Sequence, residues 1–271
     1  LNNVTIRLFI DVLMSTFNYL PSDVKQSLLN RSLLKVISGL NNFDKDSVIR
    51  IAKAADKGNA NLLDVACDPD LVRLVTECTN IPVCVSAVEP HLFPAAIESG
   101  ASMIEIGNFD SFYPEGRFFD SAEVIDLTEK TKTLLPNVFL SVTVPHTLPL
   151  DKQAELALEL VEKGADLIQT EGGTSARPLS AGNLGLIEKA SPALAAVHTI
   201  VDTFKSFGCS VPVLAASGLS VVTAPMAISV GASGIGVGSA INRLNNEIEM
   251  VAAIRSIREA ISSKECLIQK P

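Results

Sequence analysis

Short apolar runs alternate with longer amphipathic stretches along most of the chain, at intervals of roughly 30 residues. The apolar runs are rich in Val, Ile, Leu and Ala, which is typical of parallel strands buried on both faces. The stretches between them space apolar residues as helices do; Leu156, Leu160 and Val161 form one such stripe. The predicted strands are 34–38, 62–66, 83–86, 103–107, 138–144, 167–170, 213–217 and 235–238.

The number of these units decides between two architectures. Strands that alternate with helices pair in parallel, because each helix returns the chain to the same edge of the sheet. About eight such units favour an α/β fold with a single (β/α)₈ TIM barrel over an open doubly wound sheet. The first and last strands, 34–38 and 235–238, are then expected to be hydrogen-bonded neighbours.

The two ends of the chain lie outside the alternation. Residues 4–20 carry apolar side chains at helical spacing, but the stretch is short and contains Arg7 and Asp11, so it does not predict a membrane span. We expect a helix packed across one end of the barrel. The predicted divisions are an N-terminal helical extension over 1–32, the barrel over 33–262 and a tail over 263–271.

Composition narrows the class of partner. The 271 residues carry a net charge of −8 and no clustered Lys or Arg, which argues against nucleic acid or an anionic membrane surface. The five cysteines show no C-x-x-C pair, and no histidine accompanies them at metal-ligand spacing. We therefore expect reduced thiols and no metal site.

Glycines follow the last two predicted strands closely, in residues 211–220 and 234–240. In (β/α)₈ barrels the loops after the seventh and eighth strands commonly form a phosphate site with a short extra helix. Glycine lets the backbone approach an anion, and N–H groups at a helix start attract it. The alternative is that these glycines only shape tight turns. The predicted phosphate contacts are Gly218, Leu219 through its main-chain N–H, Gly238, Ser239 and, from the sixth loop, Gly173.

Two connections after predicted strands are longer than usual, 108–120 and 171–183. Long loops at the carboxyl ends of barrel strands often carry lids and ligand contacts. Gly172 and Gly173 would supply a hinge, and Arg177 would reach a ligand phosphate. A packed surface loop without a ligand is the alternative.

Polar residues inside predicted strands are candidates for catalysis. Lys35 lies among apolar residues, so its ammonium must either pair with a carboxylate or lose its proton. A lowered pKa would make it a Schiff-base nucleophile or a general base. Asp64 and Glu105 lie in equivalent strands and are its predicted partners. The alternative is an inner salt bridge that only fills the barrel, which the position of Lys35 early in its strand favours.

Two carboxylates and a histidine are predicted near the mouth of the barrel. Glu105 and Glu171 would serve as acid and base if their surroundings separate their pKa values, or would bind a hydroxyl group or a divalent cation. His146 would be a proton shuttle or an ordinary surface histidine. No Ser-His-Asp order, H-E-x-x-H, Walker loop or dinucleotide spacing occurs, so no cofactor is predicted.

Several phrases also carry a resemblance to a known family. They are residues 35–44 (KVISGLNNFD), 85–90, 105–113, 141–149, 169–174 (QTEGGT) and 216–220. Over about residues 30–262, the chain resembles the plastid hypothetical-reading-frame family numbered twenty-three, found in cyanobacteria, red-algal plastids and plants. The resemblance implies a TIM barrel of the phosphate-binding kind, and no particular activity.

Two functions follow as expectations. The first is an enzyme or binder acting on a small phosphorylated metabolite at the barrel mouth. The second, which the resemblance motivates, is a non-catalytic subunit or assembly partner of a photosynthetic complex on the stromal side of the thylakoid. The resemblance also implies the chloroplast stroma or the cyanobacterial cytoplasm. A barrel fold by itself decides nothing about chemistry.

Overall fold

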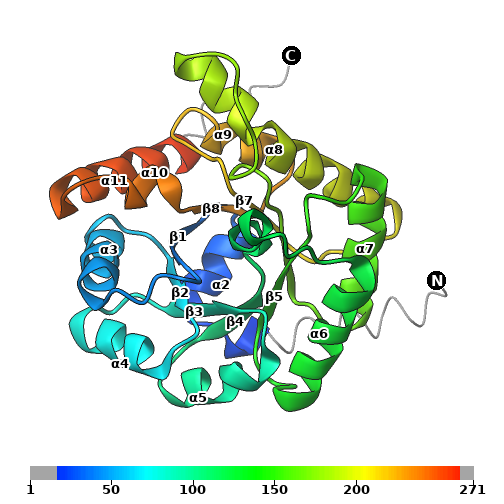
Figure 1. The fold of residues 1–271 in the computed structure, drawn as a ribbon, viewed down its shortest axis with the longest axis horizontal. Helices are drawn as coiled ribbons and strands as arrows, with labels where there is room; N and C mark the ends of the chain where they lie inside the picture. Colours follow the sequence, from blue (N-terminus) through cyan, green and yellow to red (C-terminus); the bar gives the residue numbers. More distant parts are fainter. Residues whose placement is uncertain (1–16, 263–271) are drawn as a thin grey trace.

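The eight predicted strands form a closed parallel barrel in chain order, ringed by helices (Figure 1). The structure is a computed structural model and describes residues 17–262. Each strand lies within two residues of its predicted bounds. The strands are β1 (Leu33–Gly39), β2 (Leu62–Ala66), β3 (Val83–Ala87), β4 (Met103–Ile106), β5 (Leu140–Thr143), β6 (Leu167–Gln169), β7 (Val213–Ala216) and β8 (Gly234–Val237).

Helices cover the outside of the barrel and begin where the sequence offers caps. The Asp44 and Asp68 side chains, for example, accept N–H groups of the first turns of α3 and α4. The helices are α2 (Ser22–Leu29), α3 (Lys45–Lys57), α4 (Pro69–Cys78), α5 (Phe93–Glu98), α6 (Ser121–Leu134), α7 (Leu150–Glu162), α8 (Gly182–Ser206), α9 (Ala224–Ser229), α10 (Ser239–Asn242) and α11 (Glu247–Ser262). Short 3-10 turns are η1 (Phe17–Tyr19), η2 (Pro90–Leu92), η3 (Phe109–Ser111) and η4 (Tyr113–Glu115).

The barrel closes between β1 and β8, as predicted. Leu34 pairs with Ile235 and Val36 with Val237. Glycines on β8 make room for this seam: a Cβ at Gly234 would lie 2.5 Å from the Leu33 Cβ.

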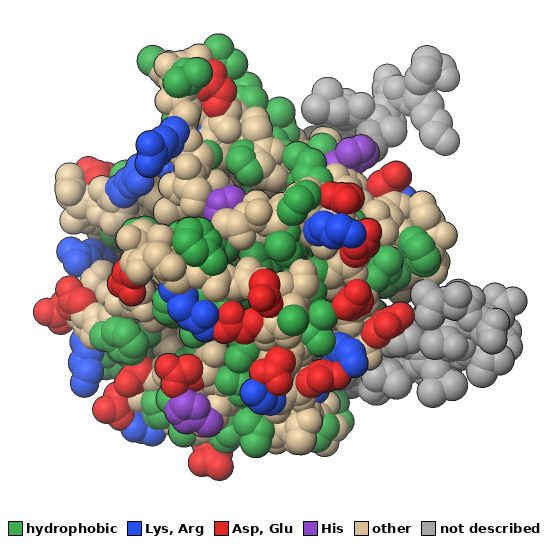
Figure 2. Space-filling view, turned by 45° about the vertical axis from the view of Figure 1, so that its right-hand side comes forward, with side chains coloured by type: hydrophobic (Ala, Val, Ile, Leu, Met, Phe, Trp, Pro, Cys, Tyr) green, Lys and Arg blue, Asp and Glu red, His purple; other side chains and the backbone are tan. Residues whose placement is uncertain are grey.

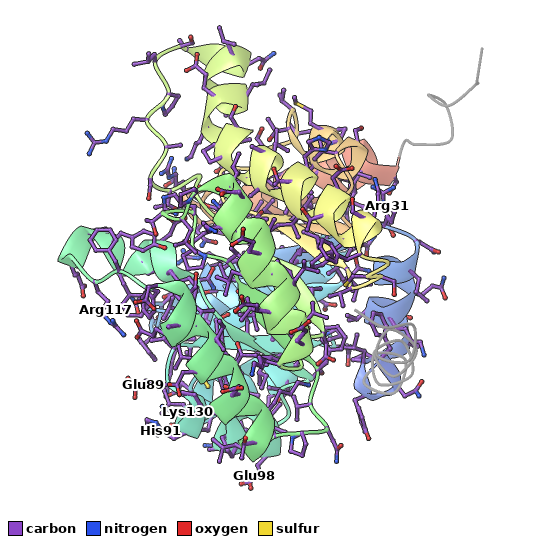
Figure 3. All side chains as sticks on the ribbon, turned by 90° about the vertical axis from the view of Figure 1, so that its right-hand side faces the viewer. Arg31, Glu89, His91, Glu98, Arg117 and Lys130 are labelled. Carbon is purple, nitrogen blue, oxygen red and sulfur yellow. The ribbon has the colours of Figure 1, made fainter. Side chains whose placement is uncertain are left out.

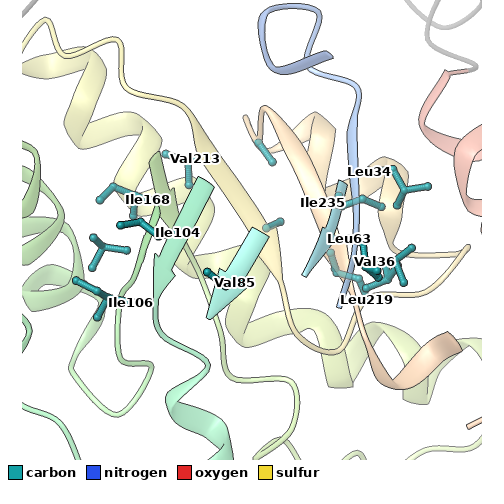
Figure 4. Packing of buried hydrophobic residues seen from close by; sticks show 14 of the residues in the cluster. Leu34, Val36, Leu63, Val85, Ile104, Ile106, Ile168, Val213, Leu219 and Ile235 are labelled. Atoms are coloured by element: carbon teal, nitrogen blue, oxygen red, sulfur yellow. The ribbon is translucent and has the colours of Figure 1, made fainter. Parts of the chain in front are cut away.

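Apolar side chains pack in two separate clusters. Outward-facing residues of the strands, such as Val36, Ile104 and Ile235, pack under the helices (Figure 4). A second cluster lies inside the amino-terminal end of the barrel, where residues of β1 to β7 except β5 meet the segment before β1, and Phe139 joins them just before β5. Its members include Phe17, Leu20, Val24, Leu28, Leu33, Leu62, Met103, Phe139, Leu167 and Leu214.

The N-terminal segment therefore closes one end of the barrel. The Phe17 and Phe139 rings meet edge to face, 5.3 Å between centroids. Arg31, between α2 and β1, donates to the carbonyl oxygens of Ile228 and Ala232. In Figure 3, Arg31 lies on the opposite side of the molecule from Arg117, which belongs to the loop after β4. The predicted helix within 4–20 lies mostly outside the described residues, as does the predicted tail over 263–271.

Two features of the outer surface are its charge and its longest helix. Acidic and basic side chains are interspersed over the face shown in Figure 2. Of the described helices, α8 alone has the length and hydropathy of a membrane span. It packs against α7 and β7 and buries Ala193, Val197 and Ile200, as a helix of the outer ring does. The four described cysteines (Cys67, Cys78, Cys84 and Cys209) are free thiols.

We predict that Gly234→Ala destabilises the closing seam by about 1–3 kcal/mol, because the new Cβ would overlap backbone and Cβ atoms of Leu33. Gly236→Ala is the matched control. Its Cβ would meet the Ala216 Cβ and the Ile37 Cδ1 at 3.0 Å each, which is less close than the 2.5 Å at Gly234, so a smaller loss is expected there. Urea denaturation of both variants checks the order, and equal losses would contradict it.

Candidate functional site

A cavity of about 170 Å³ opens at the carboxyl ends of the strands, where barrels of this kind bind their ligands. The end of β1 and the loops after β4, β6, β7 and β8 contribute to its wall. Four of the five predicted phosphate-binding residues line it, together with Glu171 of the predicted catalytic set. The four are Gly218, Leu219, Gly238 and Ser239.

Three backbone N–H groups on this wall lack a protein acceptor. In the part of the chain that the structure describes, the N–H groups of Gly218, Leu219 and Ser239 donate to no protein atom. The neighbouring N–H of Ser220, in contrast, donates to the Thr223 hydroxyl at 2.9 Å. Ser239 is the first residue of α10, where an N–H has no partner within the helix. Unused donors that face one cavity suit an anion.

Two consecutive left-handed residues shape the turn that carries these donors. Ser217 has a φ of +72° and Gly218 a φ of +76°. Left-handed backbone is unfavourable for a serine, and here its hydroxyl holds it in place, donating to Asp110 at 2.9 Å and accepting the Thr174 N–H at 3.0 Å. A Cβ at Gly218 would lie 2.6 Å from the Lys189 carbonyl oxygen, so the position requires glycine.

Leu219 and Gly173 behave differently from the other phosphate candidates. The Leu219 side chain is buried and lies beside Val36 in the outer cluster (Figure 4), so it turns away from the cavity as expected. Gly173 does not line the cavity. It packs beneath the turn, where a Cβ would lie 2.3 Å from the Gly218 Cα, and Thr174 lines the cavity in its place. Gly173 therefore supports the turn that carries the free N–H groups, and its position beneath that turn does not support the predicted contact with a phosphate.

Glu171 is the centre of a hydrogen-bond network at the mouth. Its Oε1 accepts hydrogen bonds from the Tyr113 hydroxyl and, at 3.2 Å, from the backbone N–H of His146. The same oxygen lies 3.1 Å from the ring Nδ1 of His146. Its Oε2 accepts the Asp110 N–H at 3.1 Å. Glu171 thus joins the loops that follow β4, β5 and β6.

Asp110 ties the same loops to the one after β7. Besides the Ser217 hydroxyl, its carboxylate accepts the Ser175 hydroxyl at 3.1 Å and the Gly172 N–H at 3.3 Å. The loop over 171–183 is therefore anchored by its first residues rather than hinged there. Arg177, in the same loop, is exposed and does not line the cavity, so its predicted phosphate contact is not found.

The mouth network shifts the protonation of its members. Burial raises the pKa of Glu171 from its ordinary value, although hydrogen bonds from His146 and Tyr113 oppose this. Burial disfavours the His146 imidazolium, but Glu171 and Asp110 more than offset it, so the pKa of His146 is raised. Only 17% of the His146 side chain is exposed, so the alternative of an ordinary surface histidine is wrong.

Three side chains of the mouth network, Asp110, His146 and Glu171, have the atom types of a cation site. Carboxylate and imidazole ligand atoms of Asp110, His146 and Glu171 lie within 4.8 Å of one another. Each carboxylate oxygen, however, already accepts at least one N–H or O–H group of the protein. These hydrogen bonds hold the two carboxylates in place, and the contact of 3.1 Å between Glu171 and His146 also suits proton sharing.

Lys35, Asp64 and Glu105 come together inside the barrel, as predicted. The Lys35 Nζ lies 2.6 Å from Glu105 Oε2 and 3.2 Å from Asp64 Oδ2, and all three residues are fully buried. Neighbouring strands complete the network. Ser86 donates to Asp64, Ser141 and Gln169 donate to Glu105, and Gln169 also donates to Thr143.

Of the two alternatives for Lys35, the inner salt bridge is confirmed and the lowered pKa is wrong. Burial alone would lower it, but Glu105 and Asp64 outweigh burial and raise the pKa above its ordinary value. For Asp64 the effect of burial is the larger one. Its pKa is raised to about 6, because the nearby Lys35 offsets only part of the effect of burial. Lys35 is therefore a cation near neutral pH and has no free amine to attack a carbonyl.

The interior network lies one layer below the cavity. Lys35, Asp64 and Glu105 do not line it, so among the four predicted catalytic residues only Glu171 can touch a ligand directly. Asn108, which does line the cavity, connects the two levels because its Nδ2 donates to Glu105 at 3.4 Å.

Sequence reasoning missed Asn108, Asp110, Tyr113 and Ser217. The first three lie in the long loop after β4, whose length predicts ligand contacts but does not say which side chains make them. The signal available in the sequence was an asparagine and an aspartate, Asn108 and Asp110, close after a predicted strand. Ser217 gave none, because its role depends on Asp110, which is 107 residues away in the chain.

We predict that Lys35→Met lowers the free energy of unfolding by about 3–5 kcal/mol, because it leaves Glu105 and Asp64 buried without their cation. Urea denaturation measures the loss. Lys57→Met is the control, since Lys57 forms a largely exposed pair with Glu247 and its removal should change little. Unchanged stability of Lys35→Met would rule out the salt bridge as the main role of Lys35.

A second prediction concerns pH. The pKa of Asp64 is raised from 3.8 to about 6 in the folded protein, so the folded state binds more protons than the unfolded state between these values. The stability that protonation of Asp64 contributes is fully present below pH 3.8 and is lost as pH rises through about 6. Relative to Asp64→Asn, the wild type should lose on the order of 1–3 kcal/mol of stability from pH 4 to 7. Denaturation curves across that range test it, and a difference that does not vary with pH would contradict it.

Comparison with known proteins places the chain in a family. A family model described as protein of unknown function (DUF561) matches residues 20–267. The uncharacterized protein ycf23 of Cyanophora paradoxa is 43% identical over 236 residues, which cover 87% of this chain and 95% of that protein. The ycf23 protein of Porphyra purpurea is 36% identical over 250 residues, or 92% of each chain.

Solved structures similar to this one are TIM barrels. Thiamine phosphate pyrophosphorylase from Pyrococcus furiosus aligns with a TM-score of 0.56 and 18% identity, over 86% of this chain and 96% of that one. (S)-3-O-geranylgeranylglyceryl phosphate synthase from Thermoplasma acidophilum, in complex with sn-glycerol-1-phosphate, aligns with a TM-score of 0.58 and 15% identity, over 88% and 97%. At such identities the likeness supports the fold alone. The closed eight-stranded barrel and the match to both ycf23 proteins together show that the chain belongs to the DUF561 (ycf23) family.

Proposed function

We propose that the protein binds a small phosphorylated metabolite in the cavity at the carboxyl end of the barrel. The observation that carries this is the set of three unused N–H donors, from Gly218, Leu219 and Ser239, on the wall of one cavity. They come from the loops after β7 and β8, which form the phosphate site in many (β/α)₈ barrels. The amide donors would face the phosphate oxygens, and the start of α10 would add a favourable dipole.

Two structural neighbours support this proposal by analogy. Their names include a thiamine phosphate pyrophosphorylase and a synthase holding sn-glycerol-1-phosphate, and both share the barrel. The analogy concerns the place of the phosphate and leaves the reaction open.

Within this site we assign different parts to the predicted catalytic residues. Glu171 lines the cavity and is the residue placed to exchange a proton with a ligand, with His146 as its partner in sharing that proton. Lys35, Asp64 and Glu105 act from below as positioning residues, because Glu105 holds Asn108 at the cavity floor.

We predict that Gly238→Val abolishes the binding of phosphate compounds while the far-ultraviolet circular dichroism stays near native. A Cβ at Gly238 would be 3.4 Å from the Ile37 carbonyl oxygen, which leaves room for it, but the valine methyl groups would enter the space of the anion. Calorimetric titration with inorganic phosphate and glycerol phosphate measures the loss. Gly238→Ala is the matched control and should weaken binding less. Unchanged affinity in Gly238→Val would show that the anion site is assigned wrongly.

A pair of variants at Ser239 isolates the amide donor itself. Ser239→Pro removes the N–H at the first position of a helix, where proline is otherwise tolerated, and Ser239→Ala removes only the hydroxyl. The amide assignment expects weaker phosphate binding in the proline variant and nearly native binding in the alanine variant.

A second candidate function, subunit or assembly partner of a photosynthetic complex, is favoured by one feature. Leu179 and Leu184, at the start of α8 in the part of the chain that projects from the barrel in Figure 1, are 98% and 57% exposed. An assembly partner would not need the phosphate site. Loss of function in Gly238→Val would therefore favour the phosphate-binding protein over the assembly partner. For either function we propose the chloroplast stroma or the cyanobacterial cytoplasm as the compartment.

A further inference from the structure

The cavity has two chemically different ends. The loops after β7 and β8 supply N–H groups, whereas the loops after β4 and β6 supply the carboxylates of Asp110 and Glu171. Strand β4 lies across the barrel from β8, because the eight strands close in chain order. A ligand whose phosphate lies against Ser239 therefore extends toward Glu171, and Asp110 borders both ends of the cavity through its hydrogen bond with Ser217.

The basic group nearest to those carboxylates, His146, lies behind the cavity wall rather than on it. Among the described residues, no lysine, arginine or histidine lines the cavity. The buried Lys35 pairs with Glu105 and Asp64 below it, and His146 lies behind Glu171, hydrogen-bonded to it. A second phosphate or a carboxylate on the ligand would face Asp110 and Glu171 with no positive charge beside them on the wall, and like charges this close repel strongly where water is scarce.

The same end offers hydrogen bonds to neutral hydroxyl groups. Glu171 Oε2 accepts only the Asp110 N–H, and a carboxylate oxygen has a second lone pair for a ligand O–H. The Ser111 hydroxyl has no hydrogen-bond partner among the described residues, and it lines the cavity. The Asn108 side chain uses its N–H₂ group on Glu105, which leaves its carbonyl oxygen for the ligand.

The size of the cavity suits a small ligand. Its volume of about 170 Å³ lies below the range of about 300–1,000 Å³ that is usual for pockets of drug-sized ligands. A phosphate group with a short carbon chain is a ligand of suitable size.

We propose that the natural ligand is a short, hydroxylated phosphate monoester without a second anionic group, and that Glu171 and Asp110 select against such a group. This rests on the proposed phosphate site and adds the substrate class. The phosphate lies against the donors of Gly218, Leu219 and Ser239, and the hydroxyl groups of the chain bond to Glu171 Oε2, Ser111 and Asn108.

The test compares two probes that differ at one carbon. Racemic glycerol phosphate and 3-phosphoglycerate have the same chain length, but the second carries a carboxylate where the first has a hydroxymethyl group. Calorimetric titration of the wild-type protein at constant pH and ionic strength, with inorganic phosphate as the third probe, gives the three affinities. We expect glycerol phosphate to bind at least tenfold more tightly than 3-phosphoglycerate, and more tightly than inorganic phosphate.

A charge-removing variant assigns the selectivity. Glu171→Gln keeps the shape of the side chain and should reduce the preference to less than about threefold, mainly through tighter binding of 3-phosphoglycerate. Binding of inorganic phosphate should not change. Glu129→Gln, on the outer face of α6, is the matched control and should keep the wild-type preference. Ser111→Ala should weaken glycerol phosphate several-fold without affecting inorganic phosphate, and it does not disturb the mouth network.

The outcomes separate this inference from the proposed function. If 3-phosphoglycerate binds the wild type as tightly as glycerol phosphate, the substrate class is wrong. The proposed phosphate site would still be supported in that case if Gly238→Val abolishes the binding of phosphate. If none of the three probes binds the folded wild type, both proposals fall. The wild-type comparison decides the substrate class even if Glu171→Gln does not fold, and a preference that persists in a folded Glu171→Gln overturns the role of Glu171.

Discussion

The buried ammonium group of a lysine determines which polar side chains much of the barrel interior contains. Lys35 must have its charge compensated within the strands, and Glu105 and Asp64 do so from β4 and β2. Glu105 in turn needs further donors, which Ser141 and Gln169 supply from β5 and β6. With Ser86 of β3, which donates to Asp64, the six strands β1 to β6 thus carry polar residues where aliphatic layers would be usual. On β8, Gly236 leaves space for Lys35 and Ile37.

This buried network also sets the floor of the cavity. Because Glu105 accepts the Asn108 side chain, the first residue after β4 is held in a left-handed conformation above the network. The chain then turns through η3, which presents Asp110 to the loops after β6 and β7. The mouth is therefore built on the interior, and substitutions at Lys35 or Glu105 should disturb ligand binding without either residue touching a ligand.

The fold was predictable from the sequence because its signals are local, and parts of the site were not because its contacts are distant. An apolar strand or a capped helix can be recognised from about a dozen consecutive residues. The number of strand–helix units then predicts a closed barrel. Lys35 could be assigned its partners because a buried cation needs carboxylates and few strands offered them. The network of Asp110, His146 and Glu171 joins three loops whose approach depends on the finished barrel. The direction of the Lys35 pKa shift depends on the 2.6 Å contact with Glu105, which sequence does not give.

The distribution of charge along the barrel gives the site a direction. Two carboxylates face one ammonium in the interior, and two more share one imidazole at the mouth, so negative charge predominates near β4 and β6. A phosphate is most favourable away from that charge, and the free N–H groups lie in the loops after β7 and β8. Those donors are neutral dipoles, which bind an anion without forming a salt bridge to the neighbouring carboxylates. A lysine or arginine in the same cavity would pair with Glu171 or Asp110 and block the site. The absence of such a side chain from the described wall is thus consistent with the proposed anion site beside two carboxylates.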